Sequence, residues 1–108
     1  PFKPAHCMFI YNITIKIAPE IHQQWLAWMG DEHITAMLAT GKFTRHQLLR
    51  LREVDDSDGP TYALQLFAES KADYNAFKTV HEAAFLQTQR ATWGEKMLSF
   101  STLMEIVH

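Results

Sequence analysis

The chain has 108 residues, of which 47% are hydrophobic and 20% charged, and this composition is typical of one globular domain that folds without disulfides or a structural metal. Its formal net charge of −2 provides no global attraction to nucleic acid or to an anionic membrane surface. No apolar run approaches the roughly 20 residues that span a bilayer, so we expect a chain without a membrane partner. The single cysteine, Cys7, cannot form an internal disulfide, which indicates a reducing compartment such as the cytoplasm.

Residues 1–7 differ from the rest of the chain. They contain two prolines within four residues, and the first methionine, Met8, directly precedes the first predicted strand. We therefore expect residues 1–7 to be a leader or a remnant of cloning, and residues 8–108 to form a single domain.

Residues 9–17 alternate apolar side chains with period two, which predicts a strand with one buried face. Pro19 suits the first position of a helix, and Gly41 suits the position after its end. Gly30 and Asp31 interrupt the helical pattern between them and predict a kink. The apolar stripe of this helix comprises Ile21, Trp25, Leu26, Met29, Ile34, Met37 and Leu38.

The second half of the chain predicts two further strands, a second helix and a last strand. Ser70 and Asp73 have the spacing of an N-terminal capping box, and Gly94 ends the helix that follows. The inward stripe expected for this helix is Tyr74, Phe77, His81, Ala84, Phe85 and Thr88. The expected elements are a strand over 43–54, a turn over 55–60, a strand over 61–68, a helix over 70–93 and a strand over 96–106.

This order, strand–helix–strand–strand–helix–strand, is the βαββαβ signature of the α+β, ferredoxin-like fold: a four-stranded antiparallel sheet with two helices on one face. The first and last strands carry apolar side chains on both alternations. Because such strands are buried on both faces, we expect a homodimer in which two sheets pack face to face.

Several segments resemble an uncharacterised bacterial family, a domain of unknown function, over the whole chain from Met8 onward. These segments are Met8–Thr14, Trp25–Met29, His33–Ile34, Leu38–Phe43, Leu48–Arg50, Thr61–Gln65, Asp73–Tyr74 and His81. That family is similar to the dimeric α/β-barrel superfamily, which includes antibiotic-biosynthesis monooxygenases, haem-degrading enzymes, muconolactone isomerases and amino-acid-binding regulatory domains. The resemblance implies a ferredoxin-like protomer and a dimer, and it implies no particular reaction.

His33 and His81 are the candidate catalytic residues. Each falls within the inward stripe of its predicted helix, so both rings should face the helix-covered side of the sheet, where the superfamily places its ligand cleft. An imidazole titrates near neutrality and can act as acid or base. The alternative is that each ring bonds a backbone carbonyl at the edge of the core.

We expect no metal and no cofactor. His22 and His33 share a helix face but lie about 16 Å apart at 1.5 Å per residue, too far to bind one ion. The sequence contains neither a His-x-x-x-His nor a Cys-x-x-Cys motif, and a catalytic zinc needs three protein ligands.

Three further residues are candidates for ligand binding. Asn12 is polar in an otherwise apolar strand; the resemblance implies that it positions substrate if it faces the helices, and otherwise its amide bonds a neighbouring strand or the dimer mate. Trp28 lies near the edge of the helical stripe and either walls a ligand cavity or packs beneath a loop. Arg50 either binds an anion or protects an edge strand from unwanted pairing.

Three functions remain open. The first is a dimeric domain that binds a small apolar or aromatic metabolite in the helix–sheet cleft. The second is an enzyme that uses the same cleft, either a cofactor-independent monooxygenase or an isomerase with a histidine as acid or base. The third is a structural or regulatory domain without a ligand. A pocket of roughly 300 Å³ or more would favour the first two.

Overall fold

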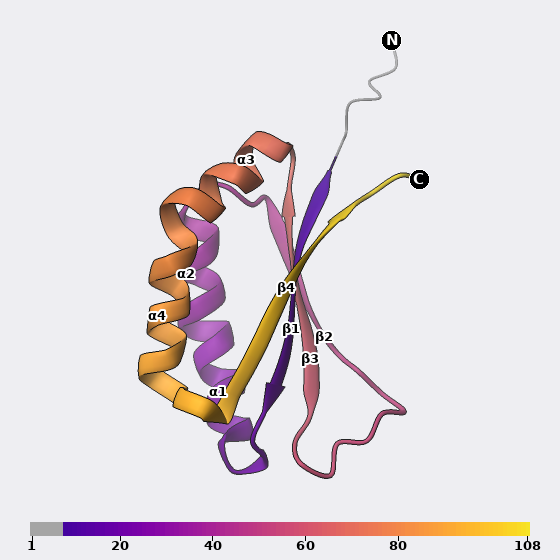
Figure 1. Cartoon of the computed structure of the whole chain (residues 1–108), viewed down its shortest axis with the longest axis vertical. Helices are drawn as coiled ribbons and strands as arrows, with labels where there is room; N and C mark the ends of the chain where they lie inside the picture. Colours follow the sequence, from indigo (N-terminus) through magenta and orange to yellow (C-terminus); the bar gives the residue numbers. More distant parts are fainter. Residues whose placement is uncertain (1–7) are drawn as a thin grey trace.

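The computed structural model describes residues 8–108; the prediction for residues 1–7 lies outside this part. One layer is a four-stranded antiparallel sheet in the order β2-β3-β1-β4, and the other is a pair of long helical stretches on one of its faces (Figure 1). The predicted ferredoxin-like βαββαβ fold is therefore confirmed. The strands are β1 (Phe9–Ile17), β2 (Arg45–Arg50), β3 (Thr61–Ala68) and β4 (Met97–Glu105).

Each long helical stretch contains one turn of π-helix within α-helix. The π turns, η2 and η3, each close a bond from an N–H to the carbonyl five residues earlier, Ile34 to Met29 and Glu82 to Phe77. The first π turn lies where Gly30 and Asp31 predict a kink. The first stretch is η1 (Pro19–Ile21), α1 (His22–Trp28), η2 (Met29–His33) and α2 (Ile34–Ala39), and the second is α3 (Lys71–Ala76), η3 (Phe77–His81), α4 (Glu82–Trp93) and η4 (Gly94–Lys96).

The odd-numbered residues of β1 face the helices and form the centre of the core. Tyr11, Ile13, Ile15 and Ile17 are all buried, as the period of two in the sequence predicts. The register places Tyr11 beside Leu66 of β3. Trp25 and Phe77, the largest fully buried side chains of the two helical stretches, complete the core from the helical side.

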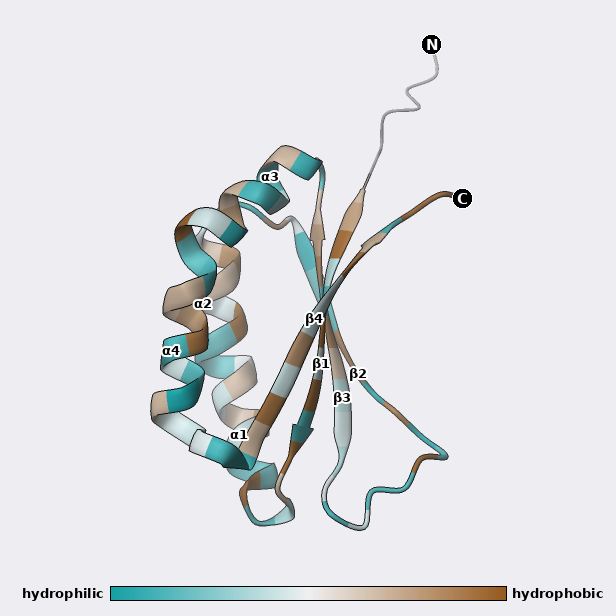
Figure 2. Cartoon of the chain, viewed as in Figure 1, coloured by the Kyte–Doolittle hydropathy of each residue, from teal (hydrophilic) through white to brown (hydrophobic). Residues whose placement is uncertain are grey.

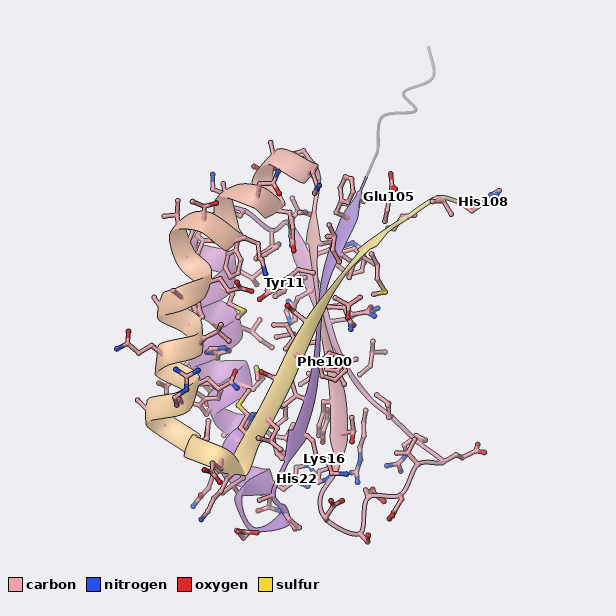
Figure 3. All side chains as sticks on the ribbon, viewed as in Figure 1. Tyr11, Lys16, His22, Phe100, Glu105 and His108 are labelled. Atoms are coloured by element: carbon pink, nitrogen blue, oxygen red, sulfur yellow. The ribbon has the colours of Figure 1, made fainter. Side chains whose placement is uncertain are left out.

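The opposite face of the sheet carries a mixture of polar and apolar side chains, and within residues 8–108 no helix covers it. Leu98 and Phe100 of β4 are 61% and 65% exposed. Hydrophobic segments alternate with polar ones along β4 (Figure 2), and Phe100 lies on the side of the sheet away from Tyr11 (Figure 3). Leu98 and Phe100 therefore place exposed apolar surface on this face of the sheet.

The predicted strand over residues 43–54 is longer than β2. Phe43 turns inward instead, where its ring is buried and stacks on Tyr11 at 6.0 Å between centroids. At the other end Leu51 still donates a hydrogen bond to β3 (3.0 Å). Glu53 then adopts a φ of 58°, which ends the extended conformation and leads the chain into the loop.

The loop before β3 packs closely against the end of β1. Gly59 has a φ of +125°, and a Cβ atom built on it would lie 1.8 Å from the carbonyl oxygen of Ile17. The backbone N–H of Ile17 donates to the carbonyl of Pro60 at 3.2 Å, and Lys16 forms an ion pair with Asp58 at 2.7 Å. Only glycine fits this position, because any side chain would collide with β1.

The second helical stretch begins with the N-cap that the sequence predicts at Ser70. The Oγ atom of Ser70 accepts a hydrogen bond from the backbone N–H of Asp73 at 3.0 Å, which is the predicted N-cap. α4 reaches Trp93 and is capped by Gly94, as predicted.

Candidate functional site

A cavity of about 130 Å³ lies between the sheet and the helical layer. Most of its wall consists of isoleucine, leucine, methionine and phenylalanine side chains from β1, β3, β4 and both helical stretches. Its polar lining residues are Tyr11, His33, Glu82, Gln89, Ser99 and Ser101. An apolar chamber with a few convergent polar groups is the usual form of a small-molecule site.

Tyr11 and Glu82 form the main polar contact in this wall. The Tyr11 hydroxyl, which points from β1 toward the helices (Figure 3), donates a hydrogen bond of 2.5 Å to a carboxylate oxygen of Glu82. Lys78, one turn earlier in the helix, forms an ion pair with the same carboxylate at 3.1 Å. Burial, followed by the hydrogen bond to Glu82, raises the pKa of Tyr11 far above its usual range, so this phenol keeps its proton. The hydrogen bond to Glu82 also raises the pKa of Lys78.

His33 lies in another part of the wall and is 5% exposed. Its ring stacks on Trp28 at 4.3 Å between centroids, and the edge of Phe85 contacts it at 5.5 Å. The π turn makes this stack possible, since it brings residues five apart onto one face. Burial lowers the pKa of His33 to about 4, so the ring is neutral near pH 7 and is a weak base there.

A second pair of polar residues joins α4 to β4 in the lining. The side-chain amide of Gln89 donates to the Oγ atom of Ser99 at 3.0 Å. Both groups therefore have a partner already, and this hydrogen bond fixes α4 against the edge strand.

His81, the second predicted catalytic residue, is not among the lining residues. It is half-buried at the end of η3, and its ring lies 5.9 Å from that of Phe77. The physical reason is the π turn, which inserts one extra residue after Phe77. The inward stripe consequently continues at Glu82, Phe85 and Gln89 instead of at His81. The structure therefore does not bring the two histidines together in this cavity, and a catalytic role for either stays a prediction.

Trp28 borders a shallow groove of about 210 Å³ on the other side of His33. This outer groove runs between the two helical stretches, and His33 and Phe85 line both it and the inner cavity. Trp28 also meets Trp93 edge to face at 5.7 Å, and the buried Nε1 of Trp93 has no hydrogen-bond partner in the described part of the chain. Trp28 thus supports His33 and does not itself line the inner cavity.

Asn12 lies on the opposite face of the sheet from His33, so the condition for its predicted role beside the helices is not met. Its register partner on β3 is Gln65, whose amide donates to Asn12 Oδ1 at 3.2 Å. Gln47 donates to Gln65 at 2.7 Å, and Asn12 donates weakly to Thr14 at 3.4 Å. The observed arrangement matches the alternative interpretation, in which the amide bonds a neighbouring strand.

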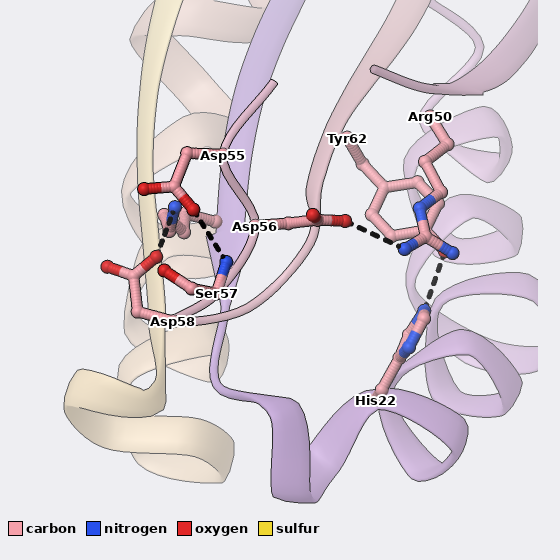
Figure 4. A network of polar contacts seen from close by, with 8 residues as sticks. His22, Arg50, Asp55, Asp56, Ser57, Asp58 and Tyr62 are labelled. Carbon is pink, nitrogen blue, oxygen red and sulfur yellow. Dashed lines mark hydrogen bonds and ion pairs between the residues drawn. The ribbon is translucent and has the colours of Figure 1, made fainter. Parts of the chain in front are cut away.

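Arg50 lies at the end of β2, remote from the cavity lining. Its guanidinium donates to Asp56 in the following loop at 3.1 Å (Figure 4). Tyr62 and His22 lie beside this contact and bond each other at 2.7 Å. An internal carboxylate therefore already occupies the guanidinium that the sequence suggests for an external anion.

Within residues 8–108, no three His, Cys, Asp or Glu side chains gather as metal ligands would. The prediction that no metal binds stays a prediction. In the same part of the chain, no helix has the length and hydrophobicity needed to cross a membrane.

Known proteins resemble this chain in fold more than in sequence. A dimeric ferredoxin-like protein from an uncultured marine organism superposes with a TM-score of 0.61 at 9% identity, over 94% of this chain and 97% of that one. An ethyl tert-butyl ether D (EthD) family protein from Bacillus halodurans superposes with a TM-score of 0.65 at 14% identity, over 92% of this chain and 99% of that one. No curated protein matches the sequence. A family model matches residues 8–107, and the chain belongs to that family, described as a domain of unknown function (DUF4286).

Proposed function

We propose that this protein is a homodimeric domain that binds a small, mainly apolar ligand in the cavity between sheet and helices. The observation that carries the proposal is the cavity itself, which combines apolar walls with the polar side chains of Tyr11, Glu82 and His33. The cavity wall thus holds the buried His33 ring and the Glu82 carboxylate, which is 16% exposed and bonded by Tyr11 and Lys78. They are readily explained if a ligand contacts them.

The volume limits the ligand. At about 130 Å³ the cavity is smaller than the roughly 300–1,000 Å³ of sites for drug-sized molecules, so the criterion derived from the sequence is not reached. An engineered apolar cavity of about 150 Å³ nevertheless binds benzene. The fitting ligand is therefore one aromatic ring or an aliphatic group of similar size.

Titration of the isotope-labelled full chain with toluene, phenol and naphthalene, followed by NMR, tests the proposal. We expect shifts at Ile13 and His33 with the single-ring compounds and not with naphthalene. The Ile13→Phe variant fills the cavity and should lose binding. A Val80→Phe variant, altered at a site 69% exposed on the helical surface, is the control and should bind normally. Absence of binding by every compound would favour a structural or regulatory domain instead.

The homodimer is supported by the uncovered face of the sheet. Leu98 and Phe100 expose more than half of their surface there, and a structurally similar protein is described as dimeric. A two-fold axis would pair this outer sheet face with the same face of a second copy. Gln47, Gln65 and Asn12 would then lie within the interface.

Light scattering at micromolar concentration tests the dimer. We expect twice the chain mass of 12.5 kDa for the unmodified protein. Phe100→Lys should yield the monomer, because it buries a charge at the interface. Val80→Lys introduces the same charge on the helical surface and should remain dimeric. A wild-type mass of one chain would contradict the proposal.

An enzyme that uses the same cavity is the second candidate, and the position of His33 favours it. With its lowered pKa, the neutral ring is more suited to hydrogen bonding a reacting oxygen than to removing a proton at neutral pH. Isomerisation or cofactor-independent oxidation of a bound single-ring substrate would support this candidate. It requires that His33→Gln loses turnover while still binding the substrate.

A further inference from the structure

The polar part of the cavity has a marked asymmetry, which bears on the class of ligand and rests on the proposed function. Its lining includes one carboxylate, Glu82, but no lysine or arginine. Lys78 contacts Glu82 from outside the lining. The remaining basic group, His33, is neutral near pH 7 because burial lowers its pKa to about 4. The carboxylate of Glu82 is therefore the only charged group in the lining, and its cation partner, Lys78, contacts it from outside the cavity.

The hydrogen-bond inventory of this end of the cavity shows unused acceptors. Glu82 accepts a hydrogen bond from the Tyr11 hydroxyl, and Lys78 Nζ lies 3.1 Å from both of its oxygens, whereas a carboxylate offers about four acceptor positions. Because Tyr11 uses its proton on Glu82, the phenol oxygen contributes only acceptor lone pairs to the cavity. The Ser101 hydroxyl beside them can rotate to donate or accept.

We infer that Glu82 and Tyr11 select a single-ring ligand that carries a hydrogen-bond donor, such as a phenol or an aromatic amine, and reject a ligand that carries a carboxylate. The donor of the ligand binds a free acceptor position of Glu82, and its ring occupies the apolar part of the cavity. A ligand carboxylate would bring a second negative charge close to Glu82 in a site of low dielectric constant.

Three single-ring compounds with different polar ends separate these possibilities: phenol, toluene and benzoate. Titrations of the full chain at pH 7 should show phenol binding at least about tenfold more tightly than toluene, as is typical of a hydrogen bond to a charged acceptor. Benzoate should not bind at concentrations that saturate the protein with phenol. Glu82→Gln should lower the preference for phenol over toluene several-fold. Glu95→Gln, the same change at an exposed site outside the cavity, should preserve the preference.

Each outcome has a distinct meaning. Equal or tighter binding of toluene would overturn the inference and leave the proposed function standing, and so would benzoate binding as tightly as phenol. If none of the three compounds bound, the proposed function itself would fail. The wild-type series alone decides between these results, so the inference remains testable even if the Glu82 variant does not fold. A preference for phenol that survived in Glu82→Gln would assign the selection to other groups.

Discussion

Removing the titratable group at position 33 should change how the stability of the fold depends on pH. His33 is 5% exposed, and burial lowers its pKa from 6.5 to about 4. The unfolded chain therefore binds a proton at this residue between pH 6.5 and 4, whereas the folded chain does not. The contribution of this pKa difference to the free energy of unfolding is fully present above pH 6.5 and is lost as the pH falls toward 4.

The magnitude follows from proton linkage. With these two pKa values, the free energy of unfolding attributable to His33 falls by about 2 kcal/mol between pH 7 and pH 5. Other groups, including carboxylates, also titrate in acid, so the comparison must be with a variant. His33→Gln keeps a planar polar side chain of similar size but does not titrate. It should lose about 2 kcal/mol less than the wild type over this interval.

Denaturant unfolding at pH 7, 6 and 5, at one protein concentration, measures this difference. His46→Gln is the matched control, because the exposed ring at that position is in water in both states, and its profile should follow that of the wild type. Parallel profiles of wild type and His33→Gln would refute the reasoning, since they would mean that water or a partner stabilises the charged ring. If His33→Gln does not fold, the NMR titration of the wild-type ring decides: a midpoint near 6.5 contradicts burial as the dominant effect.

Two further substitutions, at Gly59 and Ser70, test the local structure, and denaturant unfolding measures both. Gly59→Ala should destabilise the fold by at least about 3 kcal/mol, because its Cβ would collide with the carbonyl of Ile17. Gly30→Ala, the control at an open helical site, should instead stabilise the fold by up to about 1 kcal/mol. Equal effects of the two substitutions would contradict the close packing of Gly59 against β1. Ser70→Ala should cost about 1 kcal/mol through the lost bond to the N–H of Asp73, whereas Ser70→Asp should retain it.

The strands show how far periodicity predicts this fold. Each strand with a clear alternation agrees with its sequence: residues 9–17 form β1 and residues 61–68 form β3 at the predicted bounds. Period two is a direct consequence of strand geometry, so it survives any tertiary context. The segment over 43–54 is less regular, and there a tertiary contact, the stack of Phe43 on Tyr11, overrides local propensity.

Periodicity in the sequence predicts the residues of the cavity less well than it predicts the strands. His33 could be predicted because it falls within the apolar stripe of its helix, and its burial agrees with that stripe. Tyr11 has the sequence signature of a core residue, and nothing local shows that its hydroxyl meets Glu82, 71 residues later. Asn12 shows the converse limit: alternation groups it with Thr14 but does not say which alternation faces the helices. Only the packing of the helices decides that.

The second π turn explains why sequence reasoning misses Glu82, and it leads to a last prediction. An α-helical period counted from Phe77 reaches His81, whereas the turn η3 places Glu82 on the inward face. Deleting Val80, which is 69% exposed, would make Glu82 the fourth residue after Phe77. A regular α-helix without Val80 would therefore present the same residues on its inward face as the π turn does now. The deletion should change the free energy of unfolding by less than about 1 kcal/mol.

A deletion at the exposed Gln87 in α4 is the control for this prediction. It lies beyond the π turn and would rotate Gln89 by about 100° away from its bond with Ser99. It should therefore destabilise the fold by more than the deletion of Val80, and by about 2 kcal/mol or more, since it breaks packed contacts between α4 and β4. Because the deletion of Val80 keeps Glu82 opposite Tyr11, it should also leave the preference for phenol intact. If both deletions were equally damaging, the extra residue in η3 would not be what sets the register of the cavity wall.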